Sequence, residues 1–410
     1  MNTTHLKLGS LAGLVACLTL AVASPLHGGD WPQFRGTNAT GVSDEKNLPT
    51  EWSKDKGIKW KTPLPARGVS SPVVVGNKVY VTCSSGTRDD RLHVLCFEAT
   101  TGKQLWHRQL QATGGTARHP KSCMAANTPV ADETGVYALF ASADLAAFDS
   151  DGTLRWYRSL TGDYPTITNV VGMAASPILV NGRLIVPMDN AGESFLAALD
   201  TKYGKNVWKT ERPRVISWTT PLVRTVGTTT EVLFAGPNGL TGYDAATGES
   251  RWVFKGGGSS IPSPVLEGDS LYLPVGGVSK FALGAQGVTE KAVWAVKEAQ
   301  TGYPSPLIYE GKVFATSSQG FVVCADAKNG KLLYQERAKG AFSASPIGAD
   351  GKVYCINETG SCTVLDAKAR DWGDAVLATN DLGEETLGTP AIAGGLIFIR
   401  TDKALYAIGK

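Results

Sequence analysis

The chain has 410 residues, of which 42% are hydrophobic and 19% are charged, and this balance excludes an intrinsically disordered protein. Its 47 glycines and 21 prolines exclude a long coiled coil and indicate many turns. Forty basic and 37 acidic residues give a net charge of +3, which is too small to indicate binding to nucleic acid.

Residues 1–23 are predicted to be an export signal. Lys7 precedes an apolar run, Leu11–Ala23, that ends in small residues of the kind a signal peptidase requires, so we expect cleavage near Ser24. The run is too short to span a bilayer as a mature helix. We therefore expect the mature protein in the periplasm or outside the cell, with no transmembrane span.

A second interpretation of the leader concerns Cys17. The segment Leu14–Cys17 resembles a bacterial lipobox, which would place a lipid on Cys17 and anchor the protein to the outer membrane. The residues that follow Cys17 stay apolar, whereas a lipoprotein tether is usually polar. Plain secretion is therefore the preferred reading. Residues 24–56 follow as an N-terminal extension, which we expect to pack on the outside of the main domain.

The remaining chain is organised by a repeat. A serine or threonine, a proline, an apolar run, a glycine turn and a second apolar run occur together eight times, at intervals of 40 to 57 residues. This period is typical of the four-stranded blades of a β-propeller. The prolines of the eight anchors are Pro72, Pro129, Pro177, Pro221, Pro264, Pro306, Pro346 and Pro390.

The second half of each repeat is a tight turn followed by a strand that carries an aromatic residue, as in Asp244–Trp252. The turn favours glycine because one residue must adopt a positive φ, and its aspartate can accept hydrogen bonds from nearby backbone amides. The fifth and seventh repeats depart from this pattern at Gly284 and at 370–373, where we expect local irregularity. The tryptophans predicted to pack between blades are Trp60, Trp106, Trp156, Trp208, Trp252 and Trp294.

The eighth repeat ends one strand short, and the missing strand occurs at the other end of the propeller as Ile58–Lys61, which contains Trp60. Pairing of these ends would leave no free sheet edge. The sequence therefore predicts an all-β domain over 57–410, an eight-bladed propeller of four-stranded antiparallel blades closed by an N-terminal strand. Helix content should be minimal, because no window shows sustained helical apolar spacing.

Six cysteines remain after the leader, and none forms a Cys-x-x-Cys pair, which argues against zinc-ribbon, thioredoxin-like and c-type haem sites. Cys355 and Cys362 are predicted on two strands joined by a four-residue turn, 357–360. Pairing of Ile356 with Ser361 would set the two cysteines opposite each other. A disulfide, which export permits, and two reduced thiols packed in the blade both remain open.

The candidate working face is built by the loops between blades, together with the turns between the second and third strands of each blade. Loops on a rigid scaffold commonly carry function. Three of them, 84–91, 111–126 and 211–218, supply basic and aromatic side chains, which would form an aromatic-edged funnel for an anionic group or an acidic peptide. Solvated loop charge is the alternative. The candidate residues are Arg88, Arg91, Arg118, His119, Lys121, Arg212, Arg214 and Trp218.

No catalytic, cofactor-binding or metal-binding residue is assigned. His119 lies in a loop without histidine partners, because His93 and His107 fall on predicted strands, and no Gly-x-Ser-x-Gly elbow supports a serine nucleophile.

Together, the anchor, the turn and the trailing tryptophan resemble the pyrroloquinoline-quinone-type (PQQ-like) propeller repeat. Asp30–Gly36 resembles the opening of BamB-like proteins, BamB being a cofactor-free propeller of outer-membrane β-barrel assembly. The quinoprotein dehydrogenases of the family hold PQQ and calcium in the central funnel, through Glu, Asn and Asp ligands, and many carry an adjacent cysteine pair that this sequence lacks. The resemblance implies a cofactor-free binding or scaffolding module with a protein or peptide partner in the envelope. The alternative is a PQQ-dependent dehydrogenase acting on an alcohol or sugar.

Overall fold

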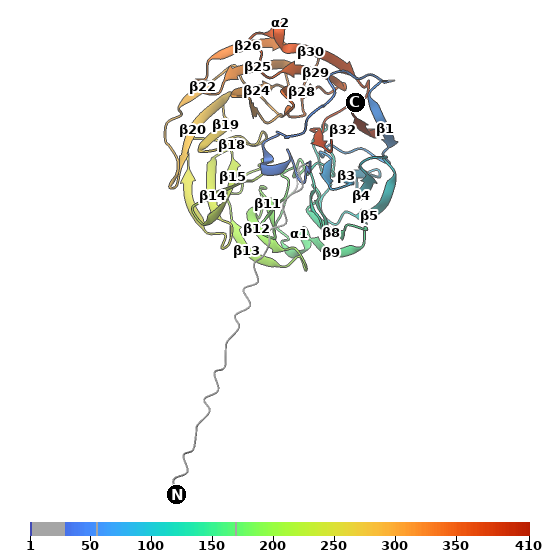
Figure 1. Cartoon of the computed structure of the whole chain (residues 1–410). Helices are drawn as coiled ribbons and strands as arrows, with labels where there is room; N and C mark the ends of the chain where they lie inside the picture. Colours follow the sequence, from blue (N-terminus) through green and yellow to red (C-terminus); the bar gives the residue numbers. More distant parts are fainter. Residues whose placement is uncertain (2–28, 55, 169) are drawn as a thin grey trace.

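A computed structural model describes residue 1 and residues 29–54, 56–168 and 170–410. The predicted export signal and Cys17 lie outside these residues. Eight antiparallel sheets stand as blades around a central axis, and the chain travels once around the ring (Figure 1). The prediction of an eight-bladed propeller is confirmed. No helix among the described residues has the length and apolar character needed to cross a membrane.

In blades 1 to 7 the strands follow one another in chain order from the axis to the rim, and in blade 8 the outermost strand comes from the start of the propeller (Figure 1). Blade 1 contains β2 (Val73–Val75), β3 (Lys78–Ser85), β4 (Arg91–Glu98) and β5 (Gln104–Gln111). Blade 2 contains β6 (Val130–Asp132), β7 (Gly135–Leu139), β8 (Asp144–Asp149) and β9 (Leu154–Ser159). Blade 3 contains β10 (Ile178–Val180), β11 (Arg183–Met188), β12 (Phe195–Asp200) and β13 (Asn206–Glu211). Blade 4 contains β14 (Leu222–Val226), β15 (Thr229–Gly236), β16 (Gly239–Asp244) and β17 (Ser250–Phe254).

The later blades keep this plan. Blade 5 contains β18 (Val265–Glu267), β19 (Ser270–Pro274), β20 (Val278–Gly284), β21 (Gly287–Val288) and β22 (Trp294–Val296). Blade 6 contains β23 (Leu307–Tyr309), β24 (Lys312–Thr316), β25 (Phe321–Asp326) and β26 (Leu332–Arg337). Blade 7 contains β27 (Ile347–Ala349), β28 (Lys352–Ile356), β29 (Ser361–Asp366) and β30 (Val376–Asp381). Blade 8 contains β31 (Ala391–Ala393), β32 (Leu396–Arg400), β33 (Ala404–Ile408) and β1 (Ile58–Pro63).

The last blade is completed by the first strand of the propeller. β1 pairs antiparallel with β33, with Trp60 opposite Ala407 and Pro63 opposite Ala404, and the C-terminus lies beside β1 (Figure 1). The ring is therefore closed by main-chain hydrogen bonds between segments that are more than 300 residues apart, as the sequence predicts.

The two irregular repeats retain complete blades. In blade 5, β20 pairs first with the short β21 and then with β22. In blade 7, the four-residue helix α2 (Trp372–Ala375) replaces the turn before β30, and its Trp372 ring contacts Tyr334 of blade 6 at 5.7 Å between centroids. Regular helix is otherwise confined, among the described residues, to α1 (Leu160–Asp163) and the 3-10 turn η1 (Thr37–Ala39).

The hydrophobic core consists of clusters between neighbouring blades. Each of the six tryptophans expected at these interfaces lies against a glycine of the next blade. Trp60 packs on Gly102 and its Nε1–H donates to the Ala99 carbonyl at 2.9 Å, while Trp208 packs on Gly248 and donates to the Ala245 carbonyl at 3.1 Å. The other pairs are Trp106 with Gly152, Trp156 with Gly204, Trp252 with Gly287 and Trp294 with Gly330.

The N-terminal extension crosses the face of the ring opposite the funnel, rather than packing only on its outside. Trp31 exchanges two 2.8 Å backbone hydrogen bonds with Val74 of blade 1, and the Gly41 carbonyl accepts a hydrogen bond from the Gly348 amide of blade 7. Phe34 reaches the central channel from this side. The extension therefore ties distant blades together and closes one end of the channel.

Candidate functional site

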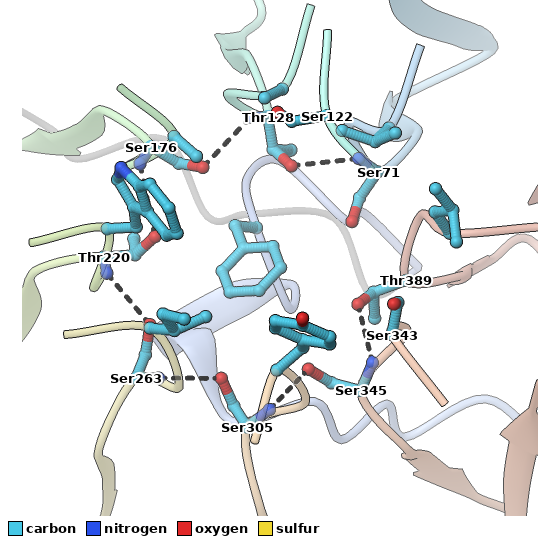
Figure 2. Close-up of a pocket in the computed structure, with 18 of the residues that line it drawn as sticks. Ser71, Ser122, Thr128, Ser176, Thr220, Ser263, Ser305, Ser343, Ser345 and Thr389 are labelled. Atoms are coloured by element: carbon cyan, nitrogen blue, oxygen red, sulfur yellow. Dashed lines mark hydrogen bonds between the residues drawn. The ribbon is translucent and has the colours of Figure 1, made fainter. Parts of the chain in front are cut away.

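The wall of the central channel is a ring of hydroxyl side chains. They belong to the residue before each anchor proline, one per blade, and Figure 2 shows them around the channel. The backbone N–H of one member donates to the hydroxyl oxygen of the next blade, as from Ser71 to Thr128 (2.9 Å) and from Ser345 to Thr389 (3.0 Å). We call these residues the hydroxyl ring. Its members are Ser71, Thr128, Ser176, Thr220, Ser263, Ser305, Ser345 and Thr389.

The sequence explains this geometry. A residue before proline is held in an extended conformation, and the proline lacks an N–H that would otherwise be unpaired at the start of the innermost strand. The serine or threonine thus enters each blade at the same depth, with its N–H directed along the ring. Repetition of the anchor in eight blades turns a local preference into a circle of hydrogen bonds.

Seven of the eight ring oxygens accept a neighbour's N–H. Within the described part of the chain, no ring hydroxyl donates its own proton to a protein acceptor. Ser71 differs from the other members because its Oγ is buried and has no hydrogen-bond partner. The ring therefore presents O–H donors toward the channel.

Above the ring, the channel opens into a funnel of about 380 Å³ with an apolar wall, and its floor is Phe34. Trp218 is fixed by a 2.8 Å hydrogen bond from its Nε1–H to the Gly172 carbonyl. The apolar and aromatic side chains of the wall are Val69, Val171, Trp218, Ile261, Tyr303 and Leu387.

The loop between blades 1 and 2 reaches across the mouth of the funnel. Lys121 donates to both carboxylate oxygens of Glu358 in blade 7 at 2.8 Å, and its Nζ lies 5.7 Å from the centre of the Tyr303 ring. The neighbouring His119 lines the funnel and accepts a hydrogen bond at Nδ1 from the Lys121 backbone N–H. The positive charge of Lys121 at the mouth is therefore neutralised by the carboxylate of Glu358.

Of the eight residues predicted for the working face, His119, Lys121 and Trp218 line the funnel. Arg118 forms an ion pair with Asp89, and Arg212 is held by buried Asp189 at 2.7 Å with its guanidinium over the Phe234 ring. The expected basic funnel is therefore corrected: two of its arginines are paired with carboxylates, Arg118 at the surface and Arg212 in the interior. The remaining three, Arg88, Arg91 and Arg214, are exposed and do not line the funnel.

A further cation, Arg35, lies buried beside the start of the innermost strand of blade 6, next to Phe34 but not in the funnel lining. Arg35 is inaccessible to solvent, and its Nη2 donates to the carbonyls of Pro306 (2.5 Å) and Thr40 (2.9 Å). Its Nε and Nη1 have no hydrogen-bond partner, and no carboxylate of the described residues forms an ion pair with it. Burial lowers the pKa of Arg35 to about 9, so the guanidinium is still charged at neutral pH. Sequence reasoning missed this residue, although it lies in the Asp30–Gly36 motif.

A polar chain on blade 1 lies apart from the funnel. Ser85 Oγ is 2.7 Å from His93 Nε2, and His93 Nδ1 is 2.9 Å from His107 Nε2. Both histidines lie on strands, as predicted. Burial, followed by the charges of His107 and Arg91, lowers the pKa of His93 to about 4. None of these three side chains lines the funnel, so the arrangement carries no catalytic assignment.

The predicted register around Cys355 and Cys362 is wrong by one residue. Asn357 donates its N–H to the Ser361 carbonyl, which shortens the turn and pairs Ile356 with Cys362. The two cysteines consequently face opposite sides of the sheet, Cys355 toward blade 6 and Cys362 toward the blade 8 side. All six described cysteines are free and buried.

The funnel lining does not match a quinone–calcium site. Calcium binds six to eight oxygen ligands, usually with several carboxylates. No aspartate, glutamate, asparagine or glutamine is among the described side chains that line the funnel. Nor do the described residues contain a group of three or more histidine, cysteine or acidic side chains that could hold a metal ion. The available donors are neutral hydroxyls, one histidine and one lysine.

Comparison with characterised proteins identifies similarity to both branches of the propeller family. The chain is 31% identical over 161 residues to outer membrane protein assembly factor BamB of Alkalilimnicola ehrlichii, which covers 39% of this chain and 37% of the relative. It is 24% identical over 242 residues to polyvinylalcohol dehydrogenase of a Pseudomonas species, covering 48% and 35%. The chain thus spans little more than a third of the length of these two relatives.

Solved structures share the fold. A europium-containing methanol dehydrogenase superposes with a TM-score of 0.71 at 12% identity, covering 93% of this chain and 89% of that one. BamB of Moraxella catarrhalis superposes with a TM-score of 0.59 at 15% identity, covering 86% and 98%. The family described as outer membrane protein assembly factor BamB matches residues 28–213, 170–287 and 278–409. These matches extend over almost the whole propeller and its extension, and the chain belongs to this BamB family.

Proposed function

We propose that the protein is a cofactor-free binding propeller of the bacterial cell envelope, which holds a protein or peptide partner on its loop face. The observation that carries the proposal is the chemistry of the funnel wall. Among the described residues that line it, the wall offers hydroxyl donors and apolar surface but no carboxylate or side-chain amide oxygen for a cation. Membership of the BamB family supports a role in the envelope.

The partner surface is the funnel mouth. Trp218 and Tyr303 are partly exposed aromatic side chains there, and aromatic residues in concave sites commonly dominate binding energy. The Lys121–Glu358 pair beside them offers a polar rim that a partner can engage by exchanging hydrogen bonds.

A dehydrogenase is the second candidate, because polyvinylalcohol dehydrogenase is among the relatives. The test that separates the two is uptake of the cofactor. Purified protein is incubated with PQQ and calcium chloride, desalted, and examined by absorbance and mass spectrometry, with a known quinoprotein as positive control. We expect no stoichiometric retention. Retention of one quinone per chain would overturn the cofactor-free proposal.

Partner binding is tested separately. The Trp218→Ala/Tyr303→Ala double variant should retain less of any envelope protein that crosslinks to the wild type. Leu105→Ala is the matched control, since Leu105 is an exposed apolar residue on the outer strand β5, away from the funnel. Equal loss in both variants would show that the captured protein does not use the funnel mouth.

A further inference from the structure

We propose that the hydroxyl ring binds the carboxylate of a ligand whose apolar stem lies against the aromatic wall of the funnel. The inference rests on the proposed binding function and names the chemistry that its funnel would recognise. Three independent observations carry it: the free O–H donors of the ring, the unpartnered Ser71 oxygen, and the buried charge of Arg35.

The donors come from the way the ring is hydrogen-bonded. A hydroxyl can accept and donate at once. In seven ring members the oxygen already accepts a backbone N–H, which leaves the O–H proton as the group available to a ligand. A ligand at the ring must therefore supply acceptors. A carboxylate does this with two oxygens and no proton of its own, and charged acceptors form the stronger hydrogen bonds.

Ser71 shows that the ring has unused capacity. Its side chain is 1% exposed, it lines the funnel, and its Oγ has no partner. A buried polar atom without a partner is costly, so such atoms are rare in folded proteins. A carboxylate oxygen at the ring would satisfy this group directly.

Arg35 supplies the charge that selects an anion. It donates to the carbonyl of Pro306, the residue that follows Ser305 of the ring, so its guanidinium lies close to the ring although it does not line the funnel itself. It has no ion-pair partner among the described residues. Because water screens a buried charge weakly, this positive charge close to the ring would favour a negative ligand over a neutral one.

The apolar wall of the funnel determines which kind of group can be attached to the carboxylate. Phe34 forms the floor, and the collar above the ring is apolar and aromatic, with Trp218 and Tyr303 facing a ligand that enters from the mouth. A polyanion would leave charges against this apolar collar, whereas a single carboxylate on an apolar stem would not. Two sources have this chemistry: the C-terminus of a polypeptide that ends in apolar residues, and a free organic acid.

The first experiment uses 4-phenylbutyrate and its neutral counterpart 4-phenylbutanol, titrated by calorimetry into the full chain at pH 7.5 without calcium. We expect saturable binding of the acid and at least tenfold weaker binding of the alcohol. Equal binding of the two would overturn the carboxylate site. A second arm compares an apolar tetrapeptide with a free C-terminus against its C-terminal amide. Preference for the free peptide alone identifies a chain end, and preference for phenylbutyrate alone identifies an organic acid. If neither carboxylate binds, the proposal is wrong.

The variants test the named groups. Ser71→Ala removes a donor without orphaning any protein group and should weaken binding of the preferred carboxylate about tenfold, as expected for one hydrogen bond to a charged acceptor. Thr316→Val is the matched control, because Thr316 Oγ1 is also buried without a partner but does not line the funnel. Arg35→Gln should weaken binding more than Arg35→Lys, which keeps the charge.

If Arg35→Gln does not fold, Ser71→Ala still decides the matter, since unchanged affinity in that variant would refute the role of the ring. No quinone or calcium is present in these titrations. If no carboxylate binds, the carboxylate site is refuted, but the proposed partner binding at the funnel mouth is not. Conversely, uptake of quinone in the earlier test would overturn the cofactor-free proposal, but it would not predict binding of phenylbutyrate through Ser71.

Discussion

The seam of the ring is the contact between blade 8, with its closing strand β1, and blade 1. Its contribution to stability can be tested at a single glycine. Gly102, in the outer turn of blade 1, has φ +70°, and a Cβ added there would lie 2.5 Å from the indole of Trp60 in β1. Gly76, in an inner turn of the same blade, has φ +55°, and an added Cβ would meet nothing within 4 Å. Alanine at either site would have to adopt an unfavourable left-handed conformation. Only in Gly102→Ala would the new methyl group also clash with the Trp60 side chain of the closing strand.

The magnitudes follow from these two contributions. A left-handed conformation costs an alanine roughly 1–2 kcal/mol relative to glycine. Overpacking against a fixed group adds about 1–3 kcal/mol. Trp60 is fixed, because it is 9% exposed and its Nε1–H is bonded to the Ala99 carbonyl at 2.9 Å. We therefore expect Gly76→Ala to cost about 1–2 kcal/mol and Gly102→Ala about 2–5 kcal/mol.

Urea denaturation followed by circular dichroism measures both free energies of unfolding. The Gly102→Ala change should be repeated in a Trp60→Ala background, where the indole is gone and the excess cost should fall to that of Gly76→Ala. The same loss of stability for Gly102→Ala and Gly76→Ala in the wild-type background would refute the seam contact.

Three further predictions concern the seam strand, the thiols and the buried histidine. Deletion of residues 57–64 should expose the edge of β33. The free energy of unfolding should fall by at least about 3–5 kcal/mol, which is the cost of removing one large buried aromatic side chain. An unchanged melting temperature would contradict closure by β1. The six described cysteines should resist alkylation in the folded protein, because they are buried and burial raises the pKa of Cys355 to about 12. After unfolding without reductant, all six should react, because all are free. Alkylation of only four would indicate a disulfide. Because the folded pKa of His93 is about 4, below its ordinary value of 6.5, its contribution to stability is present above pH 6.5 and is lost as the pH falls toward 4. His93→Asn should flatten the wild-type stability curve over that range by about 2 kcal/mol, and parallel curves for the two proteins would contradict this.

The propeller could be predicted from sequence because the local structure of each repeat is determined by residues within that repeat. The anchor proline, the turn glycine and the trailing tryptophan are all local signals, and the closing strand was recognisable because Trp60 matched the missing part of the last repeat. The two irregular repeats were placed for the same reason. What failed was a register set by a single residue: Asn357 extends the strand pair by one position, which reverses the faces of Cys355 and Cys362.

The site was less accessible to sequence reasoning, because it is made by contacts between blades. Nothing near Arg212 in the sequence indicates that Asp189 neutralises it, since the two come from different segments of blade 3. Nor does the loop sequence reveal that Lys121 reaches Glu358 across the mouth. The serine or threonine before each anchor proline was visible as a pattern, but only its repetition around a closed ring gives it a role.

The same ring links the closure of the fold to its proposed chemistry. Around the circle, seven of the eight hydroxyl oxygens are each used once by the fold as an acceptor, and the series of bonds begins at the Ser71 N–H and ends at the Thr389 oxygen. These two residues flank the seam between blades 1 and 8, where buried Arg400 of β32 donates to the Thr82 carbonyl of β3 at 3.1 Å. At this level of the channel, no ring hydrogen bond links blade 8 to blade 1, and Ser71 Oγ is left without a partner among the described residues. Ser71 is thus the ring member, among the described residues, whose hydroxyl oxygen the fold does not use, and a ligand group can be held there without breaking a hydrogen bond of the protein.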